Sequence, residues 1–176
     1  MKASYLRSFR NQTYSHESMG SLVDYVLLAC VLMSVLLVSL LLGLTRNLQP
    51  EGYMRMFMGV FFLTFAGFKF LDLKGFVSAF SGYDIIAKKD IRYAYAYPVI
   101  ELVLAAAYFF HWPFANPATI VILAIGGIGV FQELLRGNKV RCACLGTFIK
   151  LPLTTISLVE DLMMVAMAVI LAWGKI

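Results

Sequence analysis

Residues 25–44 form an uncharged run of 20 residues, and this run constrains the chain more than any other feature of its sequence. A helix of that length rises about 30 Å, the thickness of the hydrocarbon core of a bilayer. The 176-residue chain is 61% hydrophobic and only 14% charged, whereas soluble domains are about 45–50% apolar and about 25% charged. A soluble core of this size would not bury so much apolar surface. We therefore expect an integral membrane protein.

Four further apolar runs follow the first, and each is long enough to cross a bilayer as a helix. The sequence predicts an all-α, polytopic transmembrane helix bundle with about five spans. The predicted spans are 25–44, 54–71, 93–112, 114–132 and 151–173. Residues 1–20 are predicted to be a polar tail at the membrane surface, and residues 76–83 to lie along the interface. Tyr93, Tyr95 and Tyr97 fit an aromatic belt, and Gly126, Gly127 and Gly129 fit close helix packing.

The basic residues are distributed unevenly between the two sides of this predicted bundle. With five spans, twelve of the fifteen Lys and Arg fall on the side that carries the N-terminal tail and the loops around 69–92 and 133–150. Positively charged loops stay in the cytoplasm, so the N-terminus and the 133–150 loop are predicted to be cytoplasmic in a cell (inner) membrane. Because the net charge of +5 comes from such loops, no nucleic-acid partner is expected.

Two of the three cysteines form a Cys-x-Cys pair, Cys142 and Cys144, in the basic loop before the fifth predicted span. In an extended loop, residues i and i+2 point the same way, so both sulfurs could meet one partner disulfide or one metal ion. Lys139 and Arg141 favour the thiolate, which is the reactive and metal-binding form. Two thiolates suit a dithiol/disulfide couple, or equally Cu(I) or another soft metal. The sequence requires no cofactor, and the alternatives stay open.

Ionisable side chains inside the predicted spans are the second group of candidates. These residues are Lys69, Asp72, Glu101, Glu160 and Asp161. A charge at that depth is costly and usually faces a polar interior, a partner charge or a pathway.

Two questions about these residues stay open at this point. Lys69 can pair with Asp72, three residues further on, or serve as the countercharge for inward-facing acids. If the third helix begins at Pro98, Glu101 lies near the interface; if the helix runs through Pro98, Glu101 lies within the membrane.

Several stretches resemble the MauE/DoxX family of redox-associated membrane proteins. They are residues 65–76 and 83–88, Tyr97-Pro98 with Glu101, residues 139–146 with the Cys-x-Cys pair, Lys150-Leu151-Pro152, and residues 158–163. The likeness implies a four-helix MauE/DoxX-like domain over residues 51–176, with residues 21–50 as an additional N-terminal transmembrane helix. It implies a role beside methylamine utilisation, in processing or maturing the disulfide-rich small subunit of methylamine dehydrogenase.

Three functions are compatible with these patterns. The first is a membrane accessory protein whose Cys142 and Cys144 exchange disulfides with a thiol-bearing partner protein. We expect an exchange partner rather than a self-contained oxidoreductase, because only Cys30 remains to form a second pair. The second is a soft-metal binding or transport protein that uses the same two sulfurs, and the third is a structural membrane subunit.

Overall fold

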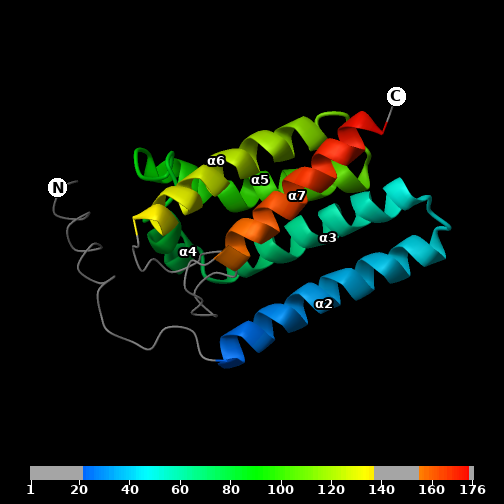
Figure 1. The fold of residues 1–176 in the computed structure, drawn as a ribbon, viewed down its shortest axis with the longest axis horizontal. Coiled ribbons are helices and arrows are strands. Elements are labelled where there is room, and N and C mark those ends of the chain that lie inside the picture. Colours follow the sequence, from blue (N-terminus) through cyan, green and yellow to red (C-terminus); the bar gives the residue numbers. More distant parts are fainter. Residues whose placement is uncertain (1–21, 137–154, 175–176) are drawn as a thin grey trace.

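The fold is a bundle of α-helices. The computed structural model describes residues 22–136 and 155–174, and all regular structure in those residues is helical. The helices are α2 (Leu22–Thr45), α3 (Pro50–Leu71), α4 (Leu73–Phe80), α5 (Ile91–Phe109), α6 (Ala115–Leu135) and α7 (Thr155–Trp173). The long helices lie side by side, and the short α4 sits at one end of them (Figure 1). The predicted all-α polytopic bundle is confirmed.

Three of these helices, α2, α3 and α6, are long and apolar enough to cross a membrane by length and composition. Helices α5 and α7 cover the other two predicted spans and have 19 residues each. At 1.5 Å per residue they are about 28 Å long, close to the hydrocarbon thickness of a bilayer. Helix α5 carries Glu101 and helix α7 carries Glu160 and Asp161. That α5 and α7 also cross the membrane stays a prediction.

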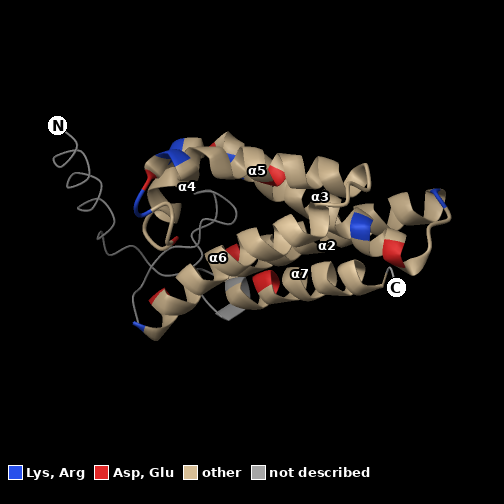
Figure 2. Cartoon of the chain, turned by 90° about the horizontal axis from the view of Figure 1, so that it is seen from above, with Lys and Arg blue, Asp and Glu red and all other residues tan. Residues whose placement is uncertain are grey.

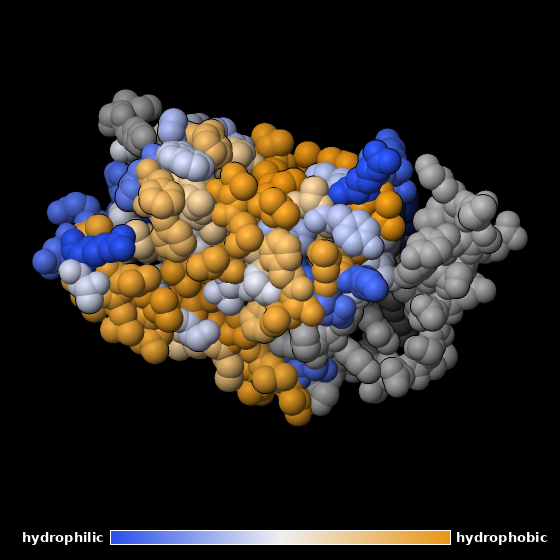
Figure 3. All heavy atoms as spheres, turned by 180° about the vertical axis from the view of Figure 1, so that it is seen from behind, coloured by the Kyte–Doolittle hydropathy of each residue, from blue (hydrophilic) through white to orange (hydrophobic). Residues whose placement is uncertain are grey.

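The surface of the bundle is apolar over its middle. Figure 3 shows a broad hydrophobic band with hydrophilic side chains towards both ends. Helix α2 illustrates why, because it buries only a stripe against α3: Leu28, Val35, Ser39 and Gly43. Its other faces are apolar and exposed, including Leu37 and Leu41. A helix that is hydrophobic all round and packed on one side must cover its remaining faces with lipid.

Helix α5 runs without interruption through Pro98, so the alternative in which the helix begins there is wrong. Proline removes one backbone hydrogen bond from a helix, and transmembrane helices tolerate it when neighbouring helices pack around it. Pro98 is fully buried in this way. Glu101 therefore lies ten residues from the start of α5, about 15 Å along the helix.

One end of the bundle gathers three chain connections, and we call it the basic end. Helix α2 begins there, α3 and α5 are joined there through α4, and α6 ends where α7 begins (Figure 1). From the helix bounds, the described cations near this end are Lys69, Lys74, Lys88, Lys89, Arg92 and Arg136, whereas Arg46 and Arg55 lie near the other end. Figure 2 shows Lys and Arg residues towards both ends of the bundle. The N-terminal side of α2, the 69–92 region and residues 133–136 at the end of α6 thus share one end, as the predicted spans require (Figure 1).

A turn between α4 and α5 is fastened to α6 at the basic end. The Asp84 carboxylate accepts hydrogen bonds from the backbone N–H groups of Ile86 and Ala87 at 2.9 and 2.8 Å. Burial raises the pKa of the Asp84 carboxyl, and these two bonds partly oppose that rise. The turn can approach α6 closely because Gly129 faces it. A Cβ at that position would lie 2.8 Å from the carbonyl oxygen of Tyr83.

We predict that Gly129→Ala destabilises the bundle, because the atom that the new methyl group meets belongs to the backbone and cannot rotate away. Overpacking of this kind costs about 1–3 kcal/mol. Thermal unfolding of the purified protein in detergent measures the loss. Gly67→Ala is the matched control, since a Cβ there meets nothing within 4 Å. It should leave the midpoint unchanged or raise it, and equal losses in the two variants would contradict this packing.

Candidate functional site

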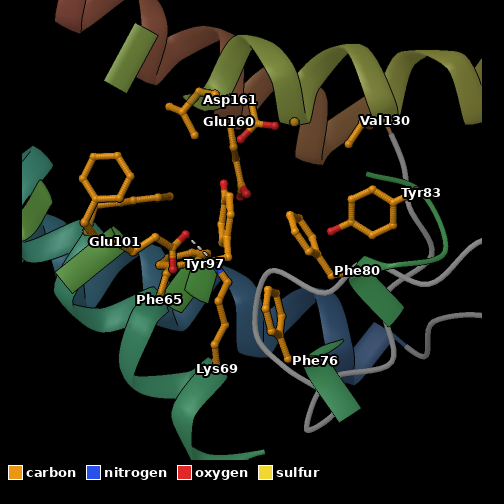
Figure 4. A pocket seen from close by; sticks show the side chains of 14 residues that line it. Phe65, Lys69, Phe76, Phe80, Tyr83, Tyr97, Glu101, Val130, Glu160 and Asp161 are labelled. Atoms are coloured by element: carbon orange, nitrogen blue, oxygen red, sulfur yellow. Dashed lines mark hydrogen bonds and ion pairs between the residues drawn. The ribbon is translucent and has the colours of Figure 1, made fainter. Parts of the chain in front are cut away.

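Four of the five intramembrane candidates converge on one cavity near the basic end. Lys69 comes from the last turn of α3, Glu101 from the middle of α5, and Glu160 and Asp161 from α7. Figure 4 shows Lys69 reaching towards Glu101 and Tyr97, with Glu160 and Asp161 on the opposite side. We call this space, of about 50 Å³, the acidic cavity. A cavity of that size has room for water molecules if polar groups line it.

The fifth candidate, Asp72, has a different position. It is the N-cap residue of α4, where its side chain accepts a hydrogen bond from the backbone N–H of Gly75 at 3.0 Å. An aspartate at this place satisfies one of the free N–H groups at a helix start and sets the angle at which α4 leaves α3. Asp72 therefore shapes the wall of the acidic cavity through α4.

Lys69 and Glu101 form a buried ion pair that joins α3 to α5. Their side chains are only 6% and 5% exposed. The Lys69 ammonium also lies 5.4 Å from the ring centre of Phe76 and 5.1 Å from that of Tyr97, positions that favour a cation over an aromatic face. The ammonium is therefore held from three sides, by one carboxylate and two rings.

The acidic cavity contains more negative than positive groups. Among the described residues that line it, Lys69 is the one cation, against Glu101, Glu160 and Asp161. Two of the buried carboxyl oxygens, Oε2 of Glu101 and Oε1 of Glu160, have no hydrogen-bond partner in the described part of the chain. Such atoms are costly in a low dielectric, so this site stands out from the apolar bundle around it.

Aromatic side chains make up most of the remaining wall. Phe76 and Phe80 of α4 stack on each other with ring centres 5.0 Å apart, and Phe80 lies 4.5 Å from Tyr97. All three are buried. The belt interpretation is therefore wrong for Tyr97, whereas Tyr95 is exposed on the outside of α5. In the sequence, the four-residue spacing of Phe76 and Phe80 could have predicted that one face of α4 packs against the bundle.

A second charged group lies at the basic end, and the sequence analysis missed it. Glu133 of α6 accepts from Lys88 at 2.7 Å and from Arg136 at 3.3 Å. The Lys88 contact spans 45 positions of sequence and ties the turn before α5 to the end of α6. The sequence could have predicted only the contact between Glu133 and Arg136, because these residues are three positions apart, a spacing at which side chains meet on a helix.

Cys142 and Cys144 lie in residues 137–154, outside the described residues. The chain leaves α6 at Arg136 and enters α7 at Thr155, and both positions are at the basic end (Figure 1). Cys142 is six residues from Arg136, and Glu160 is five residues into α7. The segment that carries the pair is thus joined at both ends to helices that line the acidic cavity. Cys30 lies on an exposed face of α2.

We predict that Lys69→Met lowers the free energy of unfolding by about 3–5 kcal/mol, because it leaves the Glu101 carboxylate buried without its ion pair. The double variant Lys69→Met/Glu101→Gln should lose less than Lys69→Met alone, because no charge remains unpaired. Unfolding of the four proteins of this cycle in detergent gives the coupling energy. Strictly additive losses would show that the pair contributes no interaction of its own.

Comparison with known proteins places the chain in a family. A search of curated proteins and a search of solved structures found no match to it. The sequence profile described as methylamine utilisation protein MauE matches residues 51–174, which include α3 to α7 and every residue of the acidic cavity. The chain is therefore a membrane protein that belongs to the MauE family.

Proposed function

We propose that this protein is a membrane accessory factor for methylamine utilisation that exchanges disulfides with a partner protein through Cys142 and Cys144. The observation that carries the proposal is the position of the pair in the sequence, between α6 and α7. The adjoining ends of these two helices lie at the basic end, where Glu133 of α6 contacts Lys88 and Arg136 (Figure 1). The MauE family match supports the methylamine context.

The local charges support thiol chemistry at the pair. Lys139 and Arg141 flank the cysteines in sequence, and Arg136 precedes them at the end of α6. Positive charge close to a thiol favours the thiolate, which is the attacking form in disulfide exchange. These basic residues, close to the pair in the sequence, support its assignment as a reactive cysteine pair.

The exchange itself needs no further oxidant or reductant. One thiolate of the pair attacks a sulfur of the partner's disulfide, forms a mixed disulfide and releases the partner's other sulfur as a thiolate. The second cysteine then loses its proton and attacks the mixed disulfide. The products are a Cys142–Cys144 disulfide and a reduced partner, in which one sulfur takes up the proton of the second cysteine and the other leaves as a thiolate. Two electrons pass from this chain to the partner, and the reverse sequence oxidises the partner.

We place the basic end in the cytoplasm, on the strength of the asymmetry in Lys and Arg. Cysteines on that side are normally kept reduced, so the resting pair is a dithiol and acts as the electron donor. The partner is a protein with disulfide-forming cysteines, of the kind that the small subunit of methylamine dehydrogenase represents.

Trapping mixed disulfides from cells tests the exchange. We expect one of the single variants Cys142→Ser and Cys144→Ser to accumulate an adduct with the partner, because the resolving thiol is missing, and the other to form none. The variant that lacks both cysteines should form none, and Cys30→Ser should behave as the wild type. The adducts are read on non-reducing gels after acid quenching and identified by mass spectrometry.

Two outcomes would overturn the proposal. An adduct of full yield in the protein that lacks Cys142 and Cys144 would assign the chemistry elsewhere. The absence of any adduct, together with Cu(I) bound in proportion to the wild-type protein and lost from the double variant, would assign the pair to a soft metal instead.

A further inference from the structure

The acidic cavity has an imbalance of charge that the described residues do not resolve. Lys69 offers one positive charge, and Glu101 occupies it in the ion pair. Glu160 and Asp161 lie on α7 and share the same cavity. Ionised carboxylates in a low-dielectric interior are tolerated only when they are paired or coordinate a cation. The two α7 acids therefore call for positive charge that the described residues of the cavity wall do not supply.

The other described groups around Glu160 do not supply that charge. The titratable groups that face the cavity from the neighbouring elements are Lys69 of α3, Tyr97 and Glu101 of α5, Tyr83 of the turn, and Asp161 beside Glu160 itself. Helix α6 contributes only Leu123, Gly126 and Val130 to the lining. Lys69 is thus the one positively charged side chain among the described residues of the wall.

Two buried carboxyl oxygens line the cavity without a partner. Glu101 is 4% exposed and Glu160 is 8% exposed. Oε2 of the first and Oε1 of the second have no hydrogen-bond partner in the described residues. Both side chains belong to the cavity lining, and Figure 4 shows their carboxyl groups directed into the space between α5 and α7. These oxygens are acceptors without donors, so a hydrogen-bond donor is the species that suits them.

The size of the cavity and the groups that line it favour a proton over a larger cation. Its volume of about 50 Å³ holds water molecules but no organic cofactor of ordinary size. Within residues 22–136 and 155–174, no three His, Cys, Asp or Glu side chains are grouped so that they could hold a metal ion. A proton carried by water needs no such geometry, because each carboxyl group can take it alone.

The cavity also lies within reach of the basic end. Lys69 is two residues from the end of α3, and Glu160 is five residues, about 8 Å, from the start of α7. Asp161 is only partly buried. The carboxyl groups therefore lie close to that end of the bundle.

We propose that the acidic cavity is a proton-binding site, in which Glu160 and Asp161 take up and release a proton while the ion pair between Lys69 and Glu101 stays fixed beside them. The reaction is the addition of H⁺ to a carboxylate oxygen and its return to cavity water, with no electron transfer. Ionisable groups that face one another inside a membrane commonly form such relays. The proposed proton site does not depend on the proposed chemistry of Cys142 and Cys144, and the two proposals are tested separately.

Infrared difference spectroscopy on the full-length protein in phosphatidylcholine vesicles tests the site directly. The pH is stepped between about 8 and about 5, and the carbonyl stretch of protonated carboxyl groups is recorded. We expect a reversible signal that shifts in D₂O, since water must reach the site. Glu160→Gln and Asp161→Asn should each remove a component of it. Glu51→Gln, an exposed acid at the other end of α3, should leave those components in place.

Two results of this experiment would contradict the proton-binding site. Unchanged difference spectra in both α7 variants would overturn the proposal. A signal that follows Na⁺ rather than pH, seen by exchanging sodium for choline, would also overturn it and assign the cavity to a metal cation. Helix content from circular dichroism confirms that each variant is folded. Two nearly isosteric substitutions at different residues keep the test decisive if one of them misfolds.

Discussion

The buried ion pair between Lys69 and Glu101 is the interaction on which the arrangement of this bundle depends. It joins α3 to α5, and α3 in turn contacts α2, α4 and α7. A buried pair of this kind is not an efficient source of stability, because the loss of hydration offsets much of its attraction, and well-packed apolar side chains of similar volume often do as well. Its effect is specificity. Sliding or rotating α3 against α5 would separate the two charges inside a medium that penalises each of them severely.

The rest of the architecture separates two environments. The outside of the bundle is apolar along its middle, with α2 exposing Leu37 and Leu41 to lipid. The polar side chains of the described residues are concentrated near one end, where the acidic cavity, the contact between Lys88 and Glu133, the end of α6 and the start of α7 all lie. In the sequence, the cysteine pair lies between α6 and α7. The proposed thiol site and the proposed proton site thus involve the same helices, although neither requires the other.

The amino-acid sequence predicts the helices well and the site in part. Uncharged runs such as residues 25–44 predict membrane-spanning helices by their length and composition. Because a charge in lipid is costly, the sequence alone also identifies four candidate site residues: Lys69, Glu101, Glu160 and Asp161. Their convergence could not be derived, because it depends on the rotation of three helices, α3, α5 and α7, about their axes. The burial of Tyr97 and the contact of Lys88 with Glu133 were missed for the same reason. Both arise from pairings between elements far apart in the chain, which no local spacing records.

Labelling with a membrane-impermeant maleimide tests most directly whether Cys142 and Cys144 work at the basic end on the cytoplasmic face. The Cys30→Ser protein is labelled in intact cells and in opened cells, each with and without prior reduction, and a variant without cysteines gives the background. The predicted result is labelling only after the cells are opened, with no need for reduction, as expected for a cytoplasmic dithiol. Labelling in intact cells would contradict it. If that labelling appeared only after reduction, the pair would be an oxidised one on the outer face, in position to act on exported proteins.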